Sequence, residues 1–170
     1  MSLIIVYFQE AKLSPWWLTE AFDFSDGASI TWKEPPPAKT VQAVGVISDH
    51  LSSRKLHEGT IENLSWQFNL TGLKLNKLVL SFNRTPFAQA TPSGKVAQSR
   101  FRKQIGIHWI RNKTLITLII QNATAGTFTC QVNAFAVEGI GFPRQFKSNV
   151  KVDVVGKLKV KSMNTDIYIY

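Results

Sequence analysis

The sequence predicts an all-β protein in which two antiparallel sheets pack face to face as a sandwich. Short runs of alternating apolar and polar residues recur along the chain, and no segment keeps a helical period. Glycine, proline and asparagine separate these runs, as expected for turns between about seven to nine short strands. With 170 residues, of which 44% are hydrophobic, the chain is long enough to bury the core of one domain.

The first predicted strand covers residues 30–33, after a segment, 1–28, that shows no steady period and is interpreted as a leader of uncertain structure. Three consecutive prolines at 35–37 stop this strand. Because proline cannot donate a hydrogen bond to a sheet, we expect the strand at a sheet edge. Residues 42–57 look like an inserted loop before the next strand.

The clearest strand follows Glu58 and Gly59. Its apolar positions are Leu64, Trp66, Phe68 and Leu70, and its polar positions are Asn63, Ser65, Gln67 and Asn69. One apolar and one polar face are typical of a half-buried antiparallel strand.

The later strands follow the same logic. Leu78, Leu80 and Phe82 repeat the alternation, and the polar stretch 83–103 suits short edge strands and exposed loops. The remaining predicted strands are 105–110, 115–120, 128–132 and 150–155.

The chain is basic, with 20 Lys and Arg against 11 Asp and Glu and a formal charge of +9. This excess favours acidic partners such as anionic glycans or an acidic protein face. Arg100 and Arg102, followed by Lys103, would share one face of a strand and suit a sulfated glycan; an edge strand that uses charge against aggregation is the alternative. Phe101 would lie on the opposite face, which disfavours nucleic acid as a partner.

Five segments match the acceptor pattern for N-glycosylation, more than chance pairing of nine asparagines with serine or threonine predicts. The candidate asparagines are Asn63, Asn69, Asn83, Asn112 and Asn122. The excess predicts a glycoprotein of the secretory pathway, extracellular or at the cell surface. No apolar run reaches the roughly 20 residues that cross a bilayer, so membrane association would require segments outside this chain.

Catalysis is not expected, and neither is a cofactor or a metal. His50, His57 and His108 stand on different segments without ligand spacing, and no phosphate-binding glycine loop or paired carboxylates are present. Cys130 is the single cysteine, so the chain cannot form an internal disulfide, and its place in a predicted strand favours a buried, unreactive thiol.

Two segments resemble the immunoglobulin superfamily. Gly126, Phe128 and Cys130 are similar to the Asp-x-Gly-x-Tyr-x-Cys corner between strands E and F, and residues 58–66 resemble the Glu-Gly-x-x-Val-x-Leu-x-Cys entry into strand B. The resemblance covers about residues 29–156, is closer to the variable (V-set) type than to the constant type, and leaves 157–170 as a C-terminal tail. The core signature that it implies is Leu64, Trp66, Leu80, Leu115, Ile120, Gly126, Phe128 and Cys130.

The chain departs from the family pattern at several signature positions. Trp66 replaces the B-strand cysteine, and we expect its indole to pack against Cys130 in place of the disulfide. Thr124 and Phe128 have lost the carboxylate and the hydroxyl of the corner. The C-strand tryptophan is also absent, with Leu78 or Leu80 near its place.

The resemblance implies a non-catalytic recognition or adhesion domain of a cell-surface receptor, with a protein ligand or a homophilic partner. Binding would use the exposed face of the C–F–G sheet or the loops at 71–77, 84–99 and 133–149; Phe135, Phe142 and Arg144 are the contact candidates in the last. Two alternatives stay open: a matrix protein that binds heparin-like glycans through Arg100, Arg102 and Lys103, and a structural spacer without a ligand.

Overall fold

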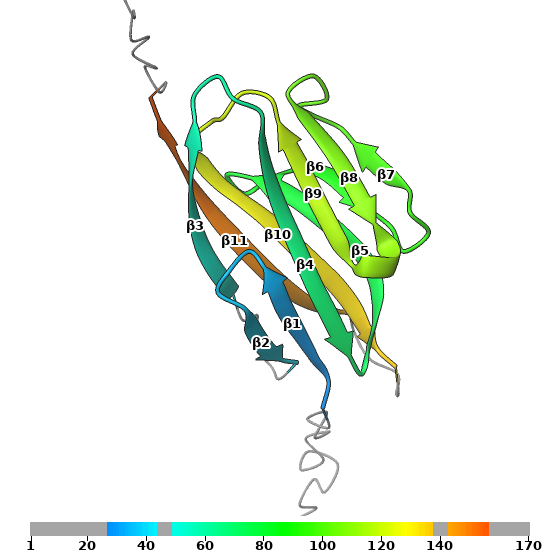
Figure 1. Ribbon diagram of the computed structural model, residues 1–170. Helices are drawn as coiled ribbons and strands as arrows, with labels where there is room; N and C mark the ends of the chain where they lie inside the picture. Colours follow the sequence, from blue (N-terminus) through cyan, green and yellow to red (C-terminus); the bar gives the residue numbers. More distant parts are fainter. Residues whose placement is uncertain (1–26, 44–48, 138–142, 157–170) are drawn as a thin grey trace, which may run out of the picture.

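The computed structural model describes residues 27–43, 49–137 and 143–156, which form two sheets packed face to face (Figure 1). In spatial order, the five-stranded sheet contains β2 (Lys39–Gln42), β1 (Ser29–Glu34), β4 (Glu62–Thr71), β9 (Leu115–Ile120) and β8 (Ile105–Ile110). The six-stranded sheet contains β3 (Asp49–His57), β11 (Arg144–Val155), β10 (Gly126–Ala136), β5 (Leu73–Phe82), β6 (Thr85–Ala90) and β7 (Val96–Gln98). A short 3-10 helix, η2 (Arg111–Lys113), joins β8 to β9.

The sheet order confirms the predicted immunoglobulin-like β-sandwich. Strands β1, β4, β9 and β8 correspond to strands A, B, E and D of that fold, and β11, β10 and β5 correspond to G, F and C. Almost all pairs are antiparallel, and β4 pairs with β9 over Glu62–Gln67. The described part of the chain contains no helix long and apolar enough to cross a membrane.

The core lies between the sheets and contains the predicted inward positions of β4, β5 and β10. Leu64, Trp66 and Phe68 of β4 are fully buried, and Cys130 and Leu80 are buried in the other sheet. The alternation in these strands therefore predicted the buried face correctly, because successive side chains of a strand point to opposite faces.

Two of the expected core residues, Leu115 and Gly126, are only half-buried. In β9 the buried positions are Ile116, Leu118 and Ile120, so Leu115 is on the outward face and only half-buried. The strand is apolar on both faces, and periodicity alone therefore did not show which set turns inward.

Residues 49–57 are not an inserted loop, contrary to the sequence-based expectation. They form β3, which pairs with β11 in parallel from Asp49 opposite Lys147 to His57 opposite Val155. His50 and Leu56 point inward and are 1% and 2% exposed. The two inward positions between them hold the polar residues Ser52 and Arg54, so the buried side chains of this strand are too widely spaced to form an apolar pattern. Residues 44–48 lie outside the described residues.

The first strand is also not at the edge of its sheet. β1 pairs with both β2 and β4, and Trp32 is fully buried between the sheets. The prolines at 35–37 stand in the turn between β1 and β2, outside the hydrogen-bonded ladder. Proline there disturbs no strand pairing.

The three expected loop segments are mostly strand. Only Gly72, with φ of +63°, separates β4 from β5, and its carbonyl accepts a hydrogen bond from the Val137 amide at 3.0 Å. Strands β6 and β7 occupy much of 84–99, and β10 and β11 occupy most of 133–149. Within the described residues, these three segments therefore contribute more strand than loop.

Candidate functional site

The outward side of the six-stranded sheet, the sheet with more strands, is here called the outer face. The alternation of buried and exposed positions and the strand register place these side chains on it: Leu51, Ser53, Lys55, Lys77, Val79, Ser81, Gln89, Thr129, Gln131, Lys147, Asn149, Lys151 and Asp153. Most of them are amides, hydroxyls or amines.

Hydrogen bonds between side chains fix the middle of the outer face. The Thr129 hydroxyl donates to Asn149 Oδ1 at 2.7 Å across β10 and β11. Gln131 Nε2 donates to Asn133 Oδ1 at 2.9 Å within β10. Side chains held in this way have little conformational entropy left to lose in a contact.

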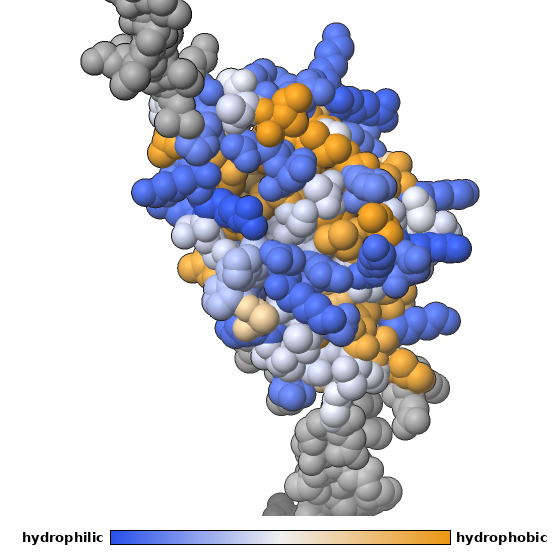
Figure 2. Space-filling model, in the orientation of Figure 1, coloured by the Kyte–Doolittle hydropathy of each residue, from blue (hydrophilic) through white to orange (hydrophobic). Residues whose placement is uncertain are grey.

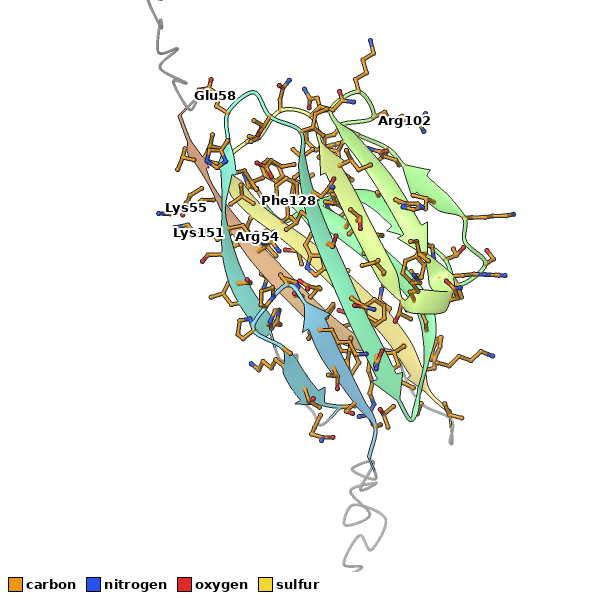
Figure 3. All side chains as sticks on the ribbon, viewed as in Figure 1. Arg54, Lys55, Glu58, Arg102, Phe128 and Lys151 are labelled. Carbon is orange, nitrogen blue, oxygen red and sulfur yellow. The ribbon has the colours of Figure 1, made fainter. Side chains whose placement is uncertain are left out.

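The charge of the outer face is mainly positive. It carries four lysines, Lys55, Lys77, Lys147 and Lys151. Among the residues named above as lying on this face, Asp153 is the one with a carboxylate. Asp153 Oδ1 is 3.7 Å from Lys151 Nζ, and both side chains are more than half exposed, so water weakens this ion pair. Figure 3 shows Lys55 and Lys151 on the neighbouring strands β3 and β11, whereas Arg54 extends from the other side of β3, at the register position of the buried Val152. The basic excess predicted from composition is thus concentrated partly on this face.

None of the five candidate glycosylation asparagines lies on the outer face. Asn63 and Asn69 point outward from β4 on the five-stranded sheet, and both are exposed. Asn112 is exposed in η2, and Asn122 is exposed in the loop between β9 and β10. Glycans at these positions would cover the opposite sheet and the ends of the sandwich.

Asn83 is the candidate nearest to the outer face, in the turn between β5 and β6. Its φ is +46°, and its Oδ1 accepts a hydrogen bond from the Thr127 amide at 2.9 Å. Its Nδ2, the atom that a glycan would modify, is not used in that bond, so the turn and the modification are compatible.

The side of the five-stranded sheet has a different surface, shown in Figure 2, where hydrophilic side chains surround separate hydrophobic patches. Ile119 contributes to the apolar surface of this sheet and is 39% exposed directly opposite Asn63 in the register of β4 and β9. A glycan on Asn63 would lie over this isoleucine.

The basic segment Arg100–Lys103 does not form a strand. It lies in the loop between β7 and β8, where Phe101 has φ of +61° and its ring contacts the rings of Phe82 and Phe87 edge-on. Arg102 Nε donates to the Gln98 carbonyl at 2.7 Å. Arg100 and Arg102 therefore do not share a strand face, and Figure 3 shows Arg102 far from Lys55 and Lys151.

The aromatic candidates near the β10–β11 connection are only partly described. Phe135 is 38% exposed near the end of β10, opposite Lys74 of β5. Arg144 opens β11, is half-buried and already interacts with other residues. Phe142 lies outside the described residues.

Trp66 and Cys130 are both fully buried in the same core, on opposite sheets. Burial raises the pKa of the Cys130 thiol far above its ordinary value, so the nucleophilic thiolate does not form at neutral pH. Leu80 stands opposite Cys130 on β5. The indole N–H of Trp66 has no hydrogen-bond partner among the described residues. Direct packing of Trp66 on Cys130 stays a prediction.

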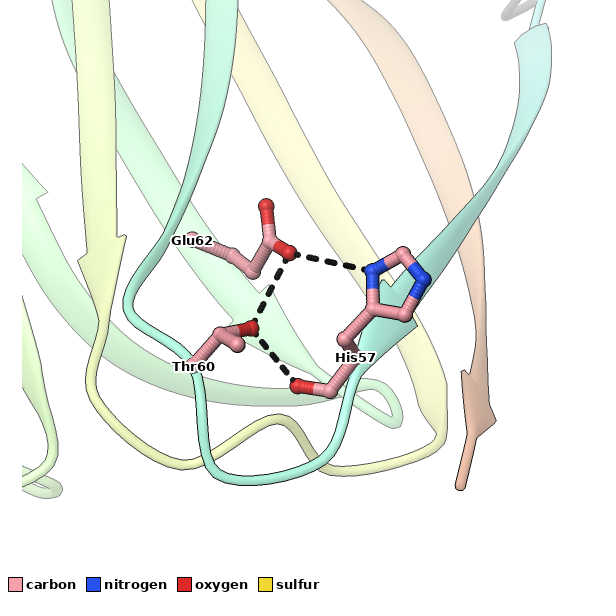
Figure 4. A network of polar contacts seen from close by, with 3 residues as sticks. All are labelled: His57, Thr60 and Glu62. Atoms are coloured by element: carbon pink, nitrogen blue, oxygen red, sulfur yellow. Dashed lines mark hydrogen bonds and ion pairs between the residues drawn. The ribbon is translucent and has the colours of Figure 1, made fainter. Parts of the chain in front are cut away.

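His57 takes part in a polar network within a turn. Figure 4 shows His57 with Thr60 and Glu62 in the turn between β3 and β4, where His57 Nδ1 is 3.6 Å from Glu62 Oε1. The Thr60 hydroxyl lies 2.9 Å from the His57 carbonyl oxygen and 3.1 Å from Glu62 Oε1. Across residues 27–43, 49–137 and 143–156, no three His, Cys, Asp or Glu side chains gather in a way that would hold a metal.

The sequence did not predict the surface formed by Leu51, Lys55, Lys147 and Lys151. The alternation of exposed Leu51, Ser53 and Lys55 with buried His50 and Leu56 was the available signal. This alternation was a weak signal for a strand, because one of the inward positions holds a histidine in place of an apolar residue.

No family model matches the chain, and no curated protein is significantly similar to it in sequence. Among solved structures, the chain is similar to a chain of the structure described as "Structural basis of T cell specificity and activation by the bacterial superantigen toxic shock syndrome toxin-1". The TM-score is 0.49 at 16% identity, over 76% of this chain and all of that chain. It is also similar to murine CRIg, with a TM-score of 0.46 at 13% identity over 60% of this chain and 92% of the other.

Proposed function

We propose that the chain is an extracellular, glycosylated, variable-type immunoglobulin-like domain that recognises a protein partner through the outer face. The variable type is supported by β6 and β7, which extend the C–F–G sheet beyond β5 as strands C′ and C″ extend it in that type. The role is binding rather than catalysis, as part of a receptor or adhesion protein at the cell surface.

The observation that carries this proposal is the one-sided distribution of the candidate glycosylation sites. Five asparagines mark the five-stranded sheet, the ends and one turn, and the outer face carries none. A bulky, hydrated glycan excludes a protein partner from the surface beneath it. A structural spacer has no reason to keep one broad face free, so the distribution favours recognition.

A glycan placed on each sheet in turn tests the proposal. Gln89 is exposed on β6 and precedes Ala90 and Thr91, so Gln89→Asn creates one acceptor site on the outer face. Leu115→Asn creates a matched site on β9, because Thr117 follows two residues later. Both variants and the unmodified chain are produced in secreting mammalian cells, and mass spectrometry measures the glycan occupancy of every site.

Tetramers of the three proteins are then applied to a panel of cells. We expect the unmodified protein and the Leu115→Asn variant to stain the same cells and the Gln89→Asn variant to lose staining. Equal staining by both variants would show that the outer face is not the binding surface. Retention of the unmodified protein by heparin alone, removed by charge reversal of Lys103, would favour the glycan-binding alternative.

A further inference from the structure

A groove of about 390 Å³ opens at the edge of the six-stranded sheet. Its lining residues are Pro36, Pro37, Leu51, Ser52, Ser53 and Lys151. Strands β3 and β11 provide the floor, and the turn between β1 and β2 provides one wall. The groove thus joins the outer face to a segment of the other sheet.

Side chains of β3 hold that wall in place. His50 is 1% exposed, and its Nε2 lies 2.8 Å from the Pro37 carbonyl oxygen. Since a carbonyl only accepts, Nε2 donates to Pro37, and Nδ1 is hydrogen-bonded to the Ser148 hydroxyl at 2.8 Å. The Ser52 hydroxyl donates to the Pro36 carbonyl at 2.7 Å. The groove is therefore formed before any partner binds.

The groove combines an exposed apolar side chain with cations. Leu51 is 71% exposed and is not part of the core. A polar residue at this position of β3 would therefore not weaken the core. The Lys151 side chain is 66% exposed, and Lys55 on the outward side of β3 is exposed as well. In the described part of the chain, Lys55 has no ion-pair partner, and Asp153, which lies opposite it in the register, pairs weakly with Lys151.

We propose that this groove binds an acidic, extended segment of the protein partner, with one apolar side chain on Leu51 and carboxylates at Lys151 and at the neighbouring Lys55. The inference rests on the proposed function and names the chemistry of its partner. The charge complementarity selects an acidic ligand. Leu51 and the two prolines favour a peptide over a sulfated glycan, because a fully polyanionic chain offers no apolar group to cover them.

The probe is a capped peptide of sequence Glu-Leu-Glu-Ser-Glu-Leu-Glu, titrated into the full ¹⁵N-labelled chain. We expect its addition to shift the amide resonances of residues 50–53 and 147–151, and raising the salt concentration to weaken the binding because salt screens exposed charges. A peptide with lysine in place of every glutamate serves as the charge control and should shift none of these resonances.

Charge reversal locates the site. Lys151→Glu should weaken binding of the acidic peptide about tenfold, in the range expected for a repulsive charge at a contact. Lys103→Glu changes the net charge equally in the distant β7–β8 loop and should leave binding unchanged. Circular dichroism confirms that both variants fold.

Three outcomes would overturn the proposal: no shifts at millimolar acidic peptide, equal weakening by the two charge reversals, or shifts in the groove with a heparin-derived oligosaccharide but not with the peptide. The titration uses unglycosylated protein and no cells. Its failure therefore leaves the cell-staining result intact, and a failure of the glycan-placement test leaves the titration intact.

Discussion

At the scale of single residues, two glycines in strands show how the same change has different effects. Gly126 has φ of +153°, and a Cβ there would lie 2.7 Å from both Asn83 Oδ1 and the Phe82 ring. Gly106 in β8 has room, since a Cβ would lie no closer than 3.5 Å to Ile119. The sequence resemblance already singled out Gly126, but only the neighbouring turn explains why a side chain does not fit.

Gly126→Ala should therefore lower the free energy of unfolding by about 1–3 kcal/mol, as overpacking does. Gly106→Ala, the matched control, should be nearly neutral. Urea denaturation of both variants measures the difference. Equal stability of the two would contradict the close approach of Asn83 and Phe82 to Gly126.

Trp66 tests the alignment with the immunoglobulin pattern. If it occupies the position of the missing cysteine, Trp66→Cys should form a disulfide with Cys130, because the backbone spacing at that position fits one. Loss of the buried indole costs about 3–5 kcal/mol, and the cross-link restores about 2–5 kcal/mol. The oxidised variant should therefore melt close to the natural protein, and the reduced variant far below it.

Mass spectrometry under non-reducing conditions detects the bond, and Trp66→Ser is the control of similar size without a thiol. A Trp66→Cys chain that folds but keeps two free thiols would show that these two positions do not face each other. The predicted packing of Trp66 on Cys130 would then be wrong.

At the scale of the elements, β3 is the strand that the sequence did not reveal. Leu56 is 2% exposed and closes the core beneath β11, whereas Leu51 on the same strand is 71% exposed. Parallel pairing with β11 is a contact between residues about 98 positions apart, as in the His50–Ser148 hydrogen bond. Local periodicity carries no information about such a partner.

Leu56→Ala should lower the free energy of unfolding by about 2–5 kcal/mol, as for other buried leucines. Leu51→Ala should change it by less than about 0.5 kcal/mol, as at most surface positions. Thermal denaturation compares the two. A neutral Leu56→Ala would mean that residues 49–57 behave as the loop that the sequence suggested.

At the scale of the whole molecule, the sandwich is held together without a disulfide. The single cysteine is fully buried, and burial raises its pKa, so the thiol is protonated throughout the neutral range. The two sheets are instead held together by the packing of large buried side chains, namely Trp32, Trp66, Phe68 and Phe128.

Reducing agent should consequently change neither the melting temperature nor the oligomeric state of the natural chain. The folded protein should resist alkylation by iodoacetamide at pH 8, and the denatured protein should react fully at Cys130. Scanning calorimetry with and without reductant, and mass spectrometry after alkylation, measure both. Rapid alkylation of the folded chain would contradict the burial of Cys130.

The sequence alone determined the fold class, the inward faces of β4, β5 and β10, and the five candidate glycosylation sites. These follow from local alternation and short motifs, which need only neighbouring residues. The tertiary structure decided which residues share a surface: it separated the glycosylation sites from the outer face, placed Arg100 and Arg102 in a loop, and assembled Pro36, Leu51 and Lys151 into one groove. Such surfaces join segments far apart in the chain, and their assembly depends on sheet order and register, which no local pattern encodes.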